Sequence, residues 1–434
     1  MNRTLTTLAV LSLAAVLAGP AAADGLRVNG LGARAQAMGG AYVGLSDDLS
    51  AFFWNPAGLA MIRGRCISAS GLDLAPRGSY QLDIPDAAAG TTGLVDARTA
   101  VSHSLAGLIG FVMPIGRNLA AGLAVYTPAK LGIVWKGGDF AALTMGKSYE
   151  WSSAVGLMTI APALAWQVSD RIAVGASFNI QRSTFGLKTH AGSLPGADGG
   201  FDLGQYEESL KGWGCGASLG VLVRPHRILS LGASLRTASE VTLKGDAAVP
   251  LLKYAGYNDA SEVSRNMTWP LWLAFGIAVF PDEDWTLTAD IQYSDWSVMD
   301  VLRNTYADAS WAPLIGEKAE RPLRWTDATR LRLGAEYRPR PGLALRAGYY
   351  RDPSPAPDAT LNVLLPSFDV NALTLGFGYA LDGLTVDIGF EIMAGAKRTV
   401  GVDDWQNDPA YASSMPGTYT MTMLVPTASV GYRF

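Results

Sequence analysis

Short and long connections alternate along this chain, and this rhythm restricts its possible folds more than any other feature. Six short polar turns span residues 115–118, 169–170, 225–228, 281–284, 339–341 and 381–383. Seven long loops span residues 73–104, 128–150, 188–211, 245–266, 299–325, 353–367 and 395–418. These thirteen connections separate fourteen strand-like segments. Short turns at one edge of a sheet and long loops at the other are typical of bacterial outer-membrane barrels.

The first 23 residues have the pattern of a secretory signal peptide. Arg3 precedes an apolar stretch from Leu5 to Leu17, and small residues follow up to Ala23. We expect cleavage between Ala23 and Asp24. The apolar stretch is too short to span a bilayer, because a membrane helix needs about 20 residues. The mature chain is therefore expected to leave the cytoplasm.

The composition of the remaining chain suits a membrane barrel. No later apolar run reaches the ~18 residues of a membrane helix. The chain has 49 Gly, 12 Trp and 16 Tyr but only 17% charged residues, as expected for a sheet with aromatic belts. Its net charge of −4, without a basic run, argues against a nucleic-acid partner. We predict an all-β fold, in which residues 62–434 form a monomeric, fourteen-stranded antiparallel transmembrane β-barrel in the outer membrane.

Apolar and polar side chains alternate with a period of two in the predicted strands, as in residues 285–294 and 384–392. In a barrel one face meets lipid and the other lines the lumen. The solvated face of a soluble sandwich is the alternative interpretation. Charges of both signs on the polar face favour a lumen network in which each charge finds a partner. Its predicted members are Asp290, Arg332, Glu336, Arg346, Asp387 and Glu391.

Residues 24–61 lack the strand pattern and precede the first predicted strand. Small residues dominate this segment. Ser46, followed by Asp47 and Asp48, predicts the first turn of a short helix that Pro56 would end. A partly helical segment has no place in the wall of a barrel. We therefore expect it inside the lumen, as a hatch that plugs the barrel.

The predicted hatch resembles that of the FadL family of long-chain fatty-acid and hydrocarbon transporters. Residues 30–59 carry the resemblance and read GLGARAQAMGGAYVGLSDDLSAFFWNPAGL. Residues 269–297, residues 330–358 and the C-terminal strand are also similar to that family. The resemblance implies a plugged barrel whose extracellular loops capture hydrophobic ligands and whose wall releases them sideways. It also implies that the hatch gates this release through Asn55, Pro56, Ala57 and Gly58. Because the sequence has no phosphate-binding loop, we expect transport to need no nucleotide.

In that family a kink in the third strand opens the wall. The third predicted strand here runs from Asn118 to Thr127, and Pro128 and Gly132 follow it as kink candidates. A proline cannot donate a hydrogen bond to the ladder, so pairing must fail or bulge near Pro128. Alternatively, Pro128 merely ends the strand at its extracellular rim. The sequence leaves both interpretations open.

Apolar side chains in the third and fourth long loops are candidates for a capture groove. A greasy ligand that crosses the polar sugar layer outside the cell needs apolar residues to collect it. In the FadL family these two loops form such a groove. The alternative is that the same residues pack on each other as a loop core. The candidates are Phe201, Leu203, Tyr206, Leu210, Val249, Leu251, Leu252, Tyr254 and Tyr257.

We predict long-chain fatty acids as the cargo, with aromatic or alkane hydrocarbons as the alternative. A fatty-acid carboxylate should meet a cation in a mostly apolar pocket, whereas a hydrocarbon needs none. The candidate cations near the extracellular strand ends are Arg182, Lys188, Arg321, Arg324 and Arg351.

The chain carries no convincing catalytic motif. Gly216, Ser218 and Gly220 match the G-x-S-x-G nucleophile elbow, but they continue a glycine-rich strand instead of entering a helix. His103 beside Ser102 is the nearest approach to a hydrolase pair, so an outer-membrane lipid hydrolase is the alternative of another class. A structural or adhesive barrel is the third. The three histidines lack metal-ligand spacing, and we expect no enzyme activity, metal or cofactor.

The last predicted strand ends with Tyr432 and Phe434. Two aromatic residues in this spacing resemble the signal recognised by the barrel-assembly machinery. We therefore expect this machinery and outer-membrane lipid as partners, besides the hydrophobic small molecule.

Cys66 and Cys215 lie in different predicted strands. We expect two buried, unpaired side chains, and a disulfide in the oxidising periplasm is the open alternative.

Overall fold

The computed structural model describes residues 25–434 apart from residues 27, 87–89 and 195–199. The predicted signal peptide and its cleavage point lie outside the described residues. Within the described ranges, no helix is both long and apolar enough to cross a membrane.

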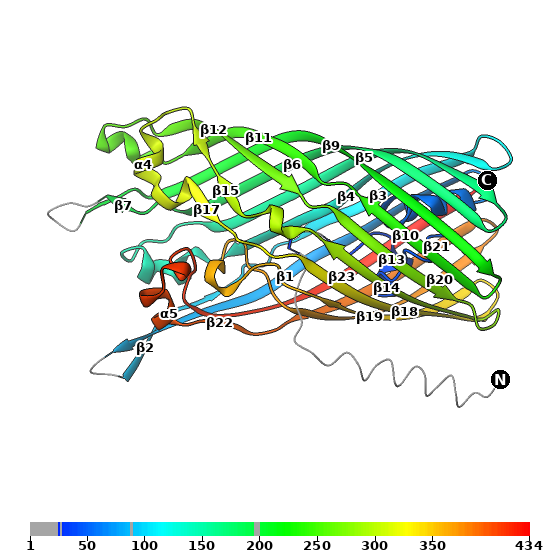
Figure 1. Cartoon of the computed structure of the whole chain (residues 1–434). Coiled ribbons are helices and arrows are strands. Elements are labelled where there is room, and N and C mark those ends of the chain that lie inside the picture. Colours follow the sequence, from blue (N-terminus) through cyan, green and yellow to red (C-terminus); the bar gives the residue numbers. More distant parts are fainter. Residues whose placement is uncertain (1–24, 27, 87–89, 195–199) are drawn as a thin grey trace.

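Fourteen wall strands close into an antiparallel barrel, as predicted (Figure 1). The first six are β1 (Cys66–Asp86), β3 (Ser104–Pro114), β4 (Leu119–Trp135), β5 (Trp151–Ser169), β6 (Ile172–His190) and β9 (Gln205–His226). The next two are each in two pieces, β10 (Leu229–Arg236) with β11 (Ser239–Ala248), and β12 (Ala260–Trp269) with β13 (Trp272–Val279). The last six are β14 (Trp285–Ser294), β18 (Ala328–Arg340), β19 (Leu343–Asp352), β20 (Val370–Leu381), β21 (Leu384–Gly395) and β23 (Gly417–Arg433). Pairing of β1 with β23, from Cys66 opposite Arg433, closes the ring.

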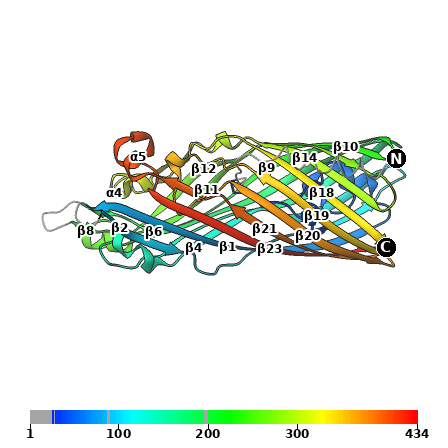
Figure 2. The same ribbon diagram turned by 90° about the horizontal axis from the view of Figure 1, so that it is seen from below.

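The two ends of the barrel differ as the sequence predicted. The C-terminus and the tight turns lie at one end, and the long loops lie at the other (Figures 1 and 2). The end with the tight turns is the periplasmic one, as is typical of outer-membrane barrels.

Several strands extend farther toward the extracellular side than predicted. β1 continues to Asp86 and pairs with β2 (Gly90–Arg98), so much of the predicted first loop is a hairpin. β4 likewise continues to Trp135. The predicted strand ends were wrong because outward side chains must be apolar only where they meet lipid. Beyond the membrane the backbone ladder persists while the alternation fades.

The extracellular loops contain short elements of their own. The strands are β7 (Ser193–Leu194), β8 (Phe201–Asp202), β15 (Val301–Arg303), β16 (Thr305–Tyr306), β17 (Glu320–Pro322) and β22 (Arg398–Val400). The helices are η2 (Gly137–Leu143), η3 (Pro250–Ala255), η4 (Trp296–Val298), α4 (Trp311–Ile315), η5 (Gly316–Lys318), η6 (Asp358–Thr360), α5 (Val402–Asn407) and η7 (Pro409–Tyr411).

The helical part of the predicted hatch lies inside the periplasmic half of the barrel (Figure 2). Its elements are α2 (Ala33–Ala37), α3 (Ala51–Trp54) and η1 (Pro56–Met61). The helix expected directly after Ser46 begins instead at Ala51, because Ser46 itself has a φ of 34°, outside the right-handed helical region. This helix ends before Pro56, as predicted.

Outward apolar side chains form a band around the periplasmic half of the wall. On β6 the outward row begins at Ile172 and ends at Ile180. This length matches the 9–11 or so residues that a tilted strand needs to cross a membrane. Both cysteines are free thiols, as preferred, but Cys215 is exposed on the outward face of β9 and Cys66 is half-buried. The expectation of burial was wrong because a small, weakly polar side chain also suits a lipid-facing surface.

Candidate functional site

The wall is interrupted between β3 and β4 on its extracellular side. β4 pairs with β3 only from Ala120 to Tyr126. Its register against β5 shifts between Tyr126 and Ala129, so that Thr127 and Pro128 together oppose one residue of β5. This arrangement is a β-bulge, which suits a residue that has no N–H to donate. Of the two interpretations of the sequence, the bulge is therefore correct, and Pro128 does not end the strand.

β1 has the matching interruption. Its ladder with β3 ends at Leu74, and its ladder with β2 begins at Ser79. Residues 99–103, here termed the strap, cross the space between these ladders. The Thr99 N–H donates to a β1 carbonyl (3.0 Å), and the Ala100 N–H donates to a β4 carbonyl (2.8 Å). With the bond from Lys136 N–H to Arg98 O (3.1 Å), only a few backbone hydrogen bonds stand where a regular wall would have a ladder.

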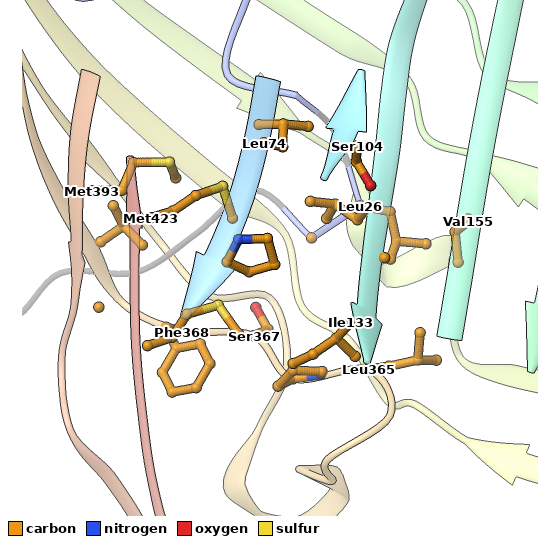
Figure 3. A pocket seen from close by; sticks show the side chains of 18 of the residues that line it. Leu26, Leu74, Ser104, Ile133, Val155, Leu365, Ser367, Phe368, Met393 and Met423 are labelled. Atoms are coloured by element: carbon orange, nitrogen blue, oxygen red, sulfur yellow. The ribbon is translucent and has the colours of Figure 1, made fainter. Parts of the chain in front are cut away.

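An apolar cavity of about 100 Å³ lies inside the wall at this interruption (Figure 3). The hatch reaches its edge, where the Val28 N–H donates to Pro128 O (3.1 Å). The apolar lining comes from the hatch, from the loop before β20, and from the six wall strands β1, β4, β5, β20, β21 and β23. Its described members include Leu26, Leu74, Leu131, Ile133, Val155, Leu364, Leu365, Phe368, Met393 and Met423, and Gly132 also lines it.

The charge at this cavity is acidic. Asp352 is the only charged residue among the described residues that line it, and Arg330 Nε donates to its Oδ1 (2.9 Å). Ser153 Oγ, which also lines the cavity, donates to Leu364 O. A cavity of this composition can hold an apolar molecule but offers a carboxylate no partner of opposite charge.

The structure disperses the five cations predicted to bind a carboxylate, and none belongs to the described lining of this cavity. Arg182 faces outward, with its guanidinium 5.6 Å from the centre of the Trp213 ring. Lys188 Nζ forms an ion pair with Glu150 (2.8 Å). The other three lie on β17, directly after it and on β19, and are Arg321, Arg324 and Arg351.

Most of the predicted groove residues pack into a buried core beneath the loops. Tyr254 and Tyr257 are exposed, while Phe201 and Leu251 are partly buried. The remaining five are buried, as the loop-core alternative expected, and are Leu203, Tyr206, Leu210, Val249 and Leu252. A capture role for the exposed tyrosines stays a prediction.

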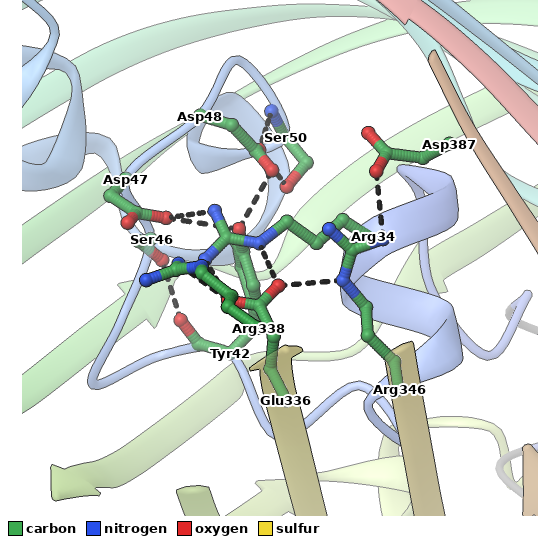
Figure 4. A network of polar contacts seen from close by, with 10 residues as sticks. All are labelled: Arg34, Tyr42, Ser46, Asp47, Asp48, Ser50, Glu336, Arg338, Arg346 and Asp387. Atoms are coloured by element: carbon green, nitrogen blue, oxygen red, sulfur yellow. Dashed lines mark hydrogen bonds and ion pairs between the residues drawn. The ribbon is translucent and has the colours of Figure 1, made fainter. Parts of the chain in front are cut away.

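An ionic network joins the hatch to the wall at the periplasmic end (Figure 4). Arg34 of α2 donates to Asp47 (2.6 Å) and, through Nε, to Glu336 of β18 (2.8 Å). Glu336 also accepts from Arg346 Nε of β19 (2.6 Å), and Arg346 donates to Asp387 of β21 (2.7 Å). Because buried charges are costly without partners, these contacts hold α2 in one position.

Two more buried wall charges bind the backbone of the hatch. Asp290 Oδ2 accepts from the N–H groups of Tyr42 (2.9 Å) and Val43 (3.0 Å). Arg332 Nη1 donates to Gly39 O (2.7 Å). The charges predicted to form a lumen network do line the lumen, but many of their partners are hatch atoms. The period of the strands could not show those partners.

The hatch motif at Asn55 contacts the wall closely. Asn55 Nδ2 donates to Val221 O of β9 (3.0 Å). Glycine permits this approach, since a Cβ on Gly220 would lie 2.0 Å from Asn55 Oδ1. Pro56 packs in the same way on β6, where a Cβ on Gly175 would lie 2.3 Å from its carbonyl. The structure makes this motif a contact with the wall, and a gating role for Asn55, Pro56, Ala57 and Gly58 stays a prediction.

The histidine considered for a hydrolase has a carboxylate partner. Nδ1 of His103 lies 2.6 Å from Asp73 Oδ2. Ser102 Oγ is buried without a hydrogen-bond partner in the described structure, so it is not paired with the imidazole. Ser218 lies within β9 and not at a turn into a helix. Across the described ranges, no three His, Cys, Asp or Glu side chains group to hold a metal.

Sequence reasoning missed the loop before β20, which supplies Leu364, Leu365 and Phe368 to the cavity. The available signal was the run Val363–Leu365 inside a long loop. An uninterrupted apolar run in a loop predicts that the loop folds back onto the protein, because large exposed apolar patches are unusual.

Known proteins share this architecture. The family described as "Outer membrane protein transport protein (OMPP1/FadL/TodX)" matches residues 14–434. No curated protein sequence matches the chain. A Pseudomonas aeruginosa FadL homologue superimposes with a TM-score of 0.77 at 18% identity, covering 95% of this chain and all (100%) of that one.

Two solved toluene transporters have the same fold. The Ralstonia pickettii transporter TbuX gives a TM-score of 0.68 at 21% identity, covering 94% of this chain and 99% of that one. The Pseudomonas putida transporter TodX gives 0.71 at 19% identity, with the same two coverages of 94% and 99%. Because the family description matches nearly the whole chain, this protein belongs to the FadL/TodX family of outer-membrane transporters for hydrophobic molecules.

Proposed function

We propose that this protein passively carries uncharged hydrophobic molecules, such as hydrocarbons, across the outer membrane. The observation that supports this proposal is the lining of the cavity, in which Leu, Ile, Met and Phe dominate and Asp352 is the sole charge among the described members. A carboxylate would meet no cation among the described lining residues, since Asp352 is already paired with Arg330, and this disfavours its burial. Long-chain fatty acids, favoured by the sequence, are the alternative cargo.

The proposed exit is the interruption between β3 and β4. It adjoins the cavity, and the outward apolar residues Leu123 and Val125 of β4 lie just before Pro128. The exit therefore lies at the outer edge of the apolar band, and a molecule leaving sideways passes from there into the acyl chains beside Leu123 and Val125. The strap and the Val28 bond to Pro128 close this exit, so that strap or hatch must move to open it.

Uptake of two labelled probes tests the cargo. Toluene is a suitable neutral probe, since two solved family members are described as toluene transporters, and palmitate is the charged one. Cells that carry this protein as their only family member should take up toluene faster than cells without it, and excess palmitate should not compete. Uptake of palmitate without uptake of toluene would overturn the neutral cargo while leaving passive transport intact.

A charge placed in the cavity tests the route. Met423→Lys puts an ammonium group in the apolar lining and should lower toluene uptake about tenfold or more. Met145→Lys, the matched control, changes an exposed loop residue and should leave uptake unchanged. Equal uptake by both folded variants would show that toluene bypasses the cavity.

Deleting Pro128 tests the exit. The deletion removes the extra residue of the bulge, leaving Thr127 opposite Met158 with the inward and outward faces unchanged. Regular pairing should tighten the wall and lower uptake, while heat-modifiable migration on a gel reports that the barrel still folds. Deletion of Gly146, in an extracellular loop, serves as the control. Normal uptake through the folded Pro128 deletion would rule out the wall exit.

A further inference from the structure

The outer surface of the barrel carries a row of polar groups on four neighbouring strands. Thr184, Lys211, Lys244 and Ser264 are paired in register across β6, β9, β11 and β12. Each of the four side chains is exposed or partly exposed. Directly paired side chains of neighbouring strands stand on the same face of a sheet. The row therefore presents two ammonium groups side by side, with a hydroxyl group at each end.

Among the described residues, no carboxylate forms an ion pair with Lys211 or Lys244. Like charges directly opposite each other destabilise a sheet. The acids on the same face of β11 and β12 are Glu240, Asp246 and Glu262, and in the described structure none forms an ion pair with either lysine. An anion bound between the ammonium groups would remove their repulsion.

This row lies at the outer edge of the membrane band. Arg182, on the membrane side of Thr184 on β6, packs its guanidinium 5.6 Å from the centre of the Trp213 ring. Trp213 is 57% exposed, as expected for the aromatic belt at a membrane surface. The outward residues of β6 on the membrane side of Arg182 are the apolar Ile180 and Phe178. Acyl chains therefore reach Ile180, and lipid headgroups lie level with the cations.

We propose that Arg182, Lys211 and Lys244 bind the phosphate group of a phosphorylated lipid in the outer leaflet. A guanidinium forms paired hydrogen bonds with phosphate oxygens, and the ammonium groups add positive charge. The hydroxyls of Thr184 and Ser264 can donate from the two sides. A lipid gains contacts on the apolar residues below, which free phosphate lacks, and this favours the lipid as the occupant. The site lies outside the wall and is independent of the cargo.

Native mass spectrometry of the full chain in detergent tests this proposal, with lipid A carrying two phosphates as the probe. The wild-type protein should retain this lipid and bind dephosphorylated lipid A more weakly. In the triple variant Arg182→Gln, Lys211→Gln and Lys244→Gln, the lipid concentration at half occupancy should rise roughly 10- to 100-fold. The matched control removes three positive charges from exposed periplasmic turns, through Arg117→Gln, Arg171→Gln and Arg227→Gln.

Three outcomes would overturn the proposal. Equal retention of lipid A by the triple variant would show that these cations do not hold it. An equal loss of lipid binding in the periplasmic control would show that only the net charge of the protein matters. Displacement of the lipid by excess inorganic phosphate would make the site a simple anion site. The double variant Lys211→Arg and Lys244→Arg keeps the charges and should retain the lipid, which separates binding from misfolding of the triple variant.

Discussion

Both halves of this barrel combine buried ion pairs with apolar packing, but their buried charges bind different partners. In the periplasmic half, buried charges such as Glu336 and Asp290 bind the hatch through hydrogen bonds of defined geometry. In the extracellular half, a large apolar cluster that includes Trp269, Trp311 and Trp325 joins the strands to the loops. Charge-assisted hydrogen bonds fix position and orientation, whereas apolar contacts are not directional. The contacts of the periplasmic half thus fix the hatch in place, whereas those of the extracellular half can rearrange around a bound ligand.

The cavity stands where these two halves meet. Leu26 reaches it from the hatch, while Leu365 and Phe368 reach it from a loop. Met393 and Met423 complete its lining, and methionine adapts its shape more readily than other apolar side chains. A guest molecule there touches both the sealed half and the adaptable half, so its binding can influence the hatch.

Removal of the hatch should have the largest effect, because it removes the proposed seal of the periplasmic half. Deletion of Gly25–Leu59 leaves the closing pairs of β1 with β23 intact but removes the helices from the lumen. The barrel should assemble and leak small polar solutes, which single-channel conductance in planar bilayers measures against the full chain. A deleted barrel that conducts no more than the full chain would mean that the loops, and not the hatch, form the seal.

Loss of the central carboxylate of the ionic network should have the next largest effect. Glu336→Gln leaves Arg34 and Arg346 without their shared acid, and breaking a buried ion pair costs about 3–5 kcal/mol. We expect faster hydrogen exchange of hatch amides, while those of the extracellular core stay unchanged. Glu283→Gln, in an exposed periplasmic turn, is the control. Slow exchange of the hatch in Glu336→Gln would show that wall packing alone holds it.

The comparison of the two halves also explains what the sequence could predict. Strand number, orientation and the place of the hatch followed from local patterns, namely the period of two and the turn residues. The bulge at Pro128 was foreseen as one of two interpretations, because a missing N–H is a property of the residue itself. These features need no knowledge of distant partners.

Contacts between distant segments could not be predicted in this way. Arg34 meets Glu336 across 302 positions of sequence, and nothing in either segment names the other. The burial of the loop residues could not be predicted either. Leu203 and Tyr206 are buried, although apolar side chains would have suited an exposed groove equally well. The sequence of a segment predicts its local structure, whereas its distant contacts depend on how the closed barrel brings strands together.

A smaller effect on the seal is expected from a substitution of Gly220, the wall glycine against which Asn55 of the hatch packs. Gly220→Ala places a methyl group 2.0 Å from Asn55 Oδ1, so that the hatch must shift. Overpacking of this kind costs about 1–3 kcal/mol and should raise the conductance slightly. Gly71→Ala, with no atom within 4 Å of the new methyl group, is the matched control. Equal conductance of the two variants would show that the hatch yields at Asn55 without losing its seal.

The smallest expected effect concerns a polar clasp among the extracellular loops. Lys147 Nζ (2.8 Å) and Tyr149 OH (2.5 Å) donate to Asp202, and Nε2 of His190 lies 2.7 Å from its second oxygen. Burial alone would raise the pKa of Asp202, but these hydrogen bonds outweigh it and hold the pKa well below its usual value. The clasp therefore contributes fully above the unfolded pKa of about 4 and is lost as the pH falls toward the folded pKa.

A spin label at Met145, an exposed neighbour of the clasp, measures its opening. The label should become more mobile in the wild-type protein only below about pH 4, and in Asp202→Asn already at pH 7, because an amide lacks the charge that the clasp requires. The label in Glu283→Gln should behave as in the wild-type protein. Equal mobility at pH 7 in Asp202→Asn and the wild-type protein would show that apolar packing alone orders these loops. Apolar contacts, and not the ion pairs of Asp202, would then order the extracellular half up to the tips of its loops.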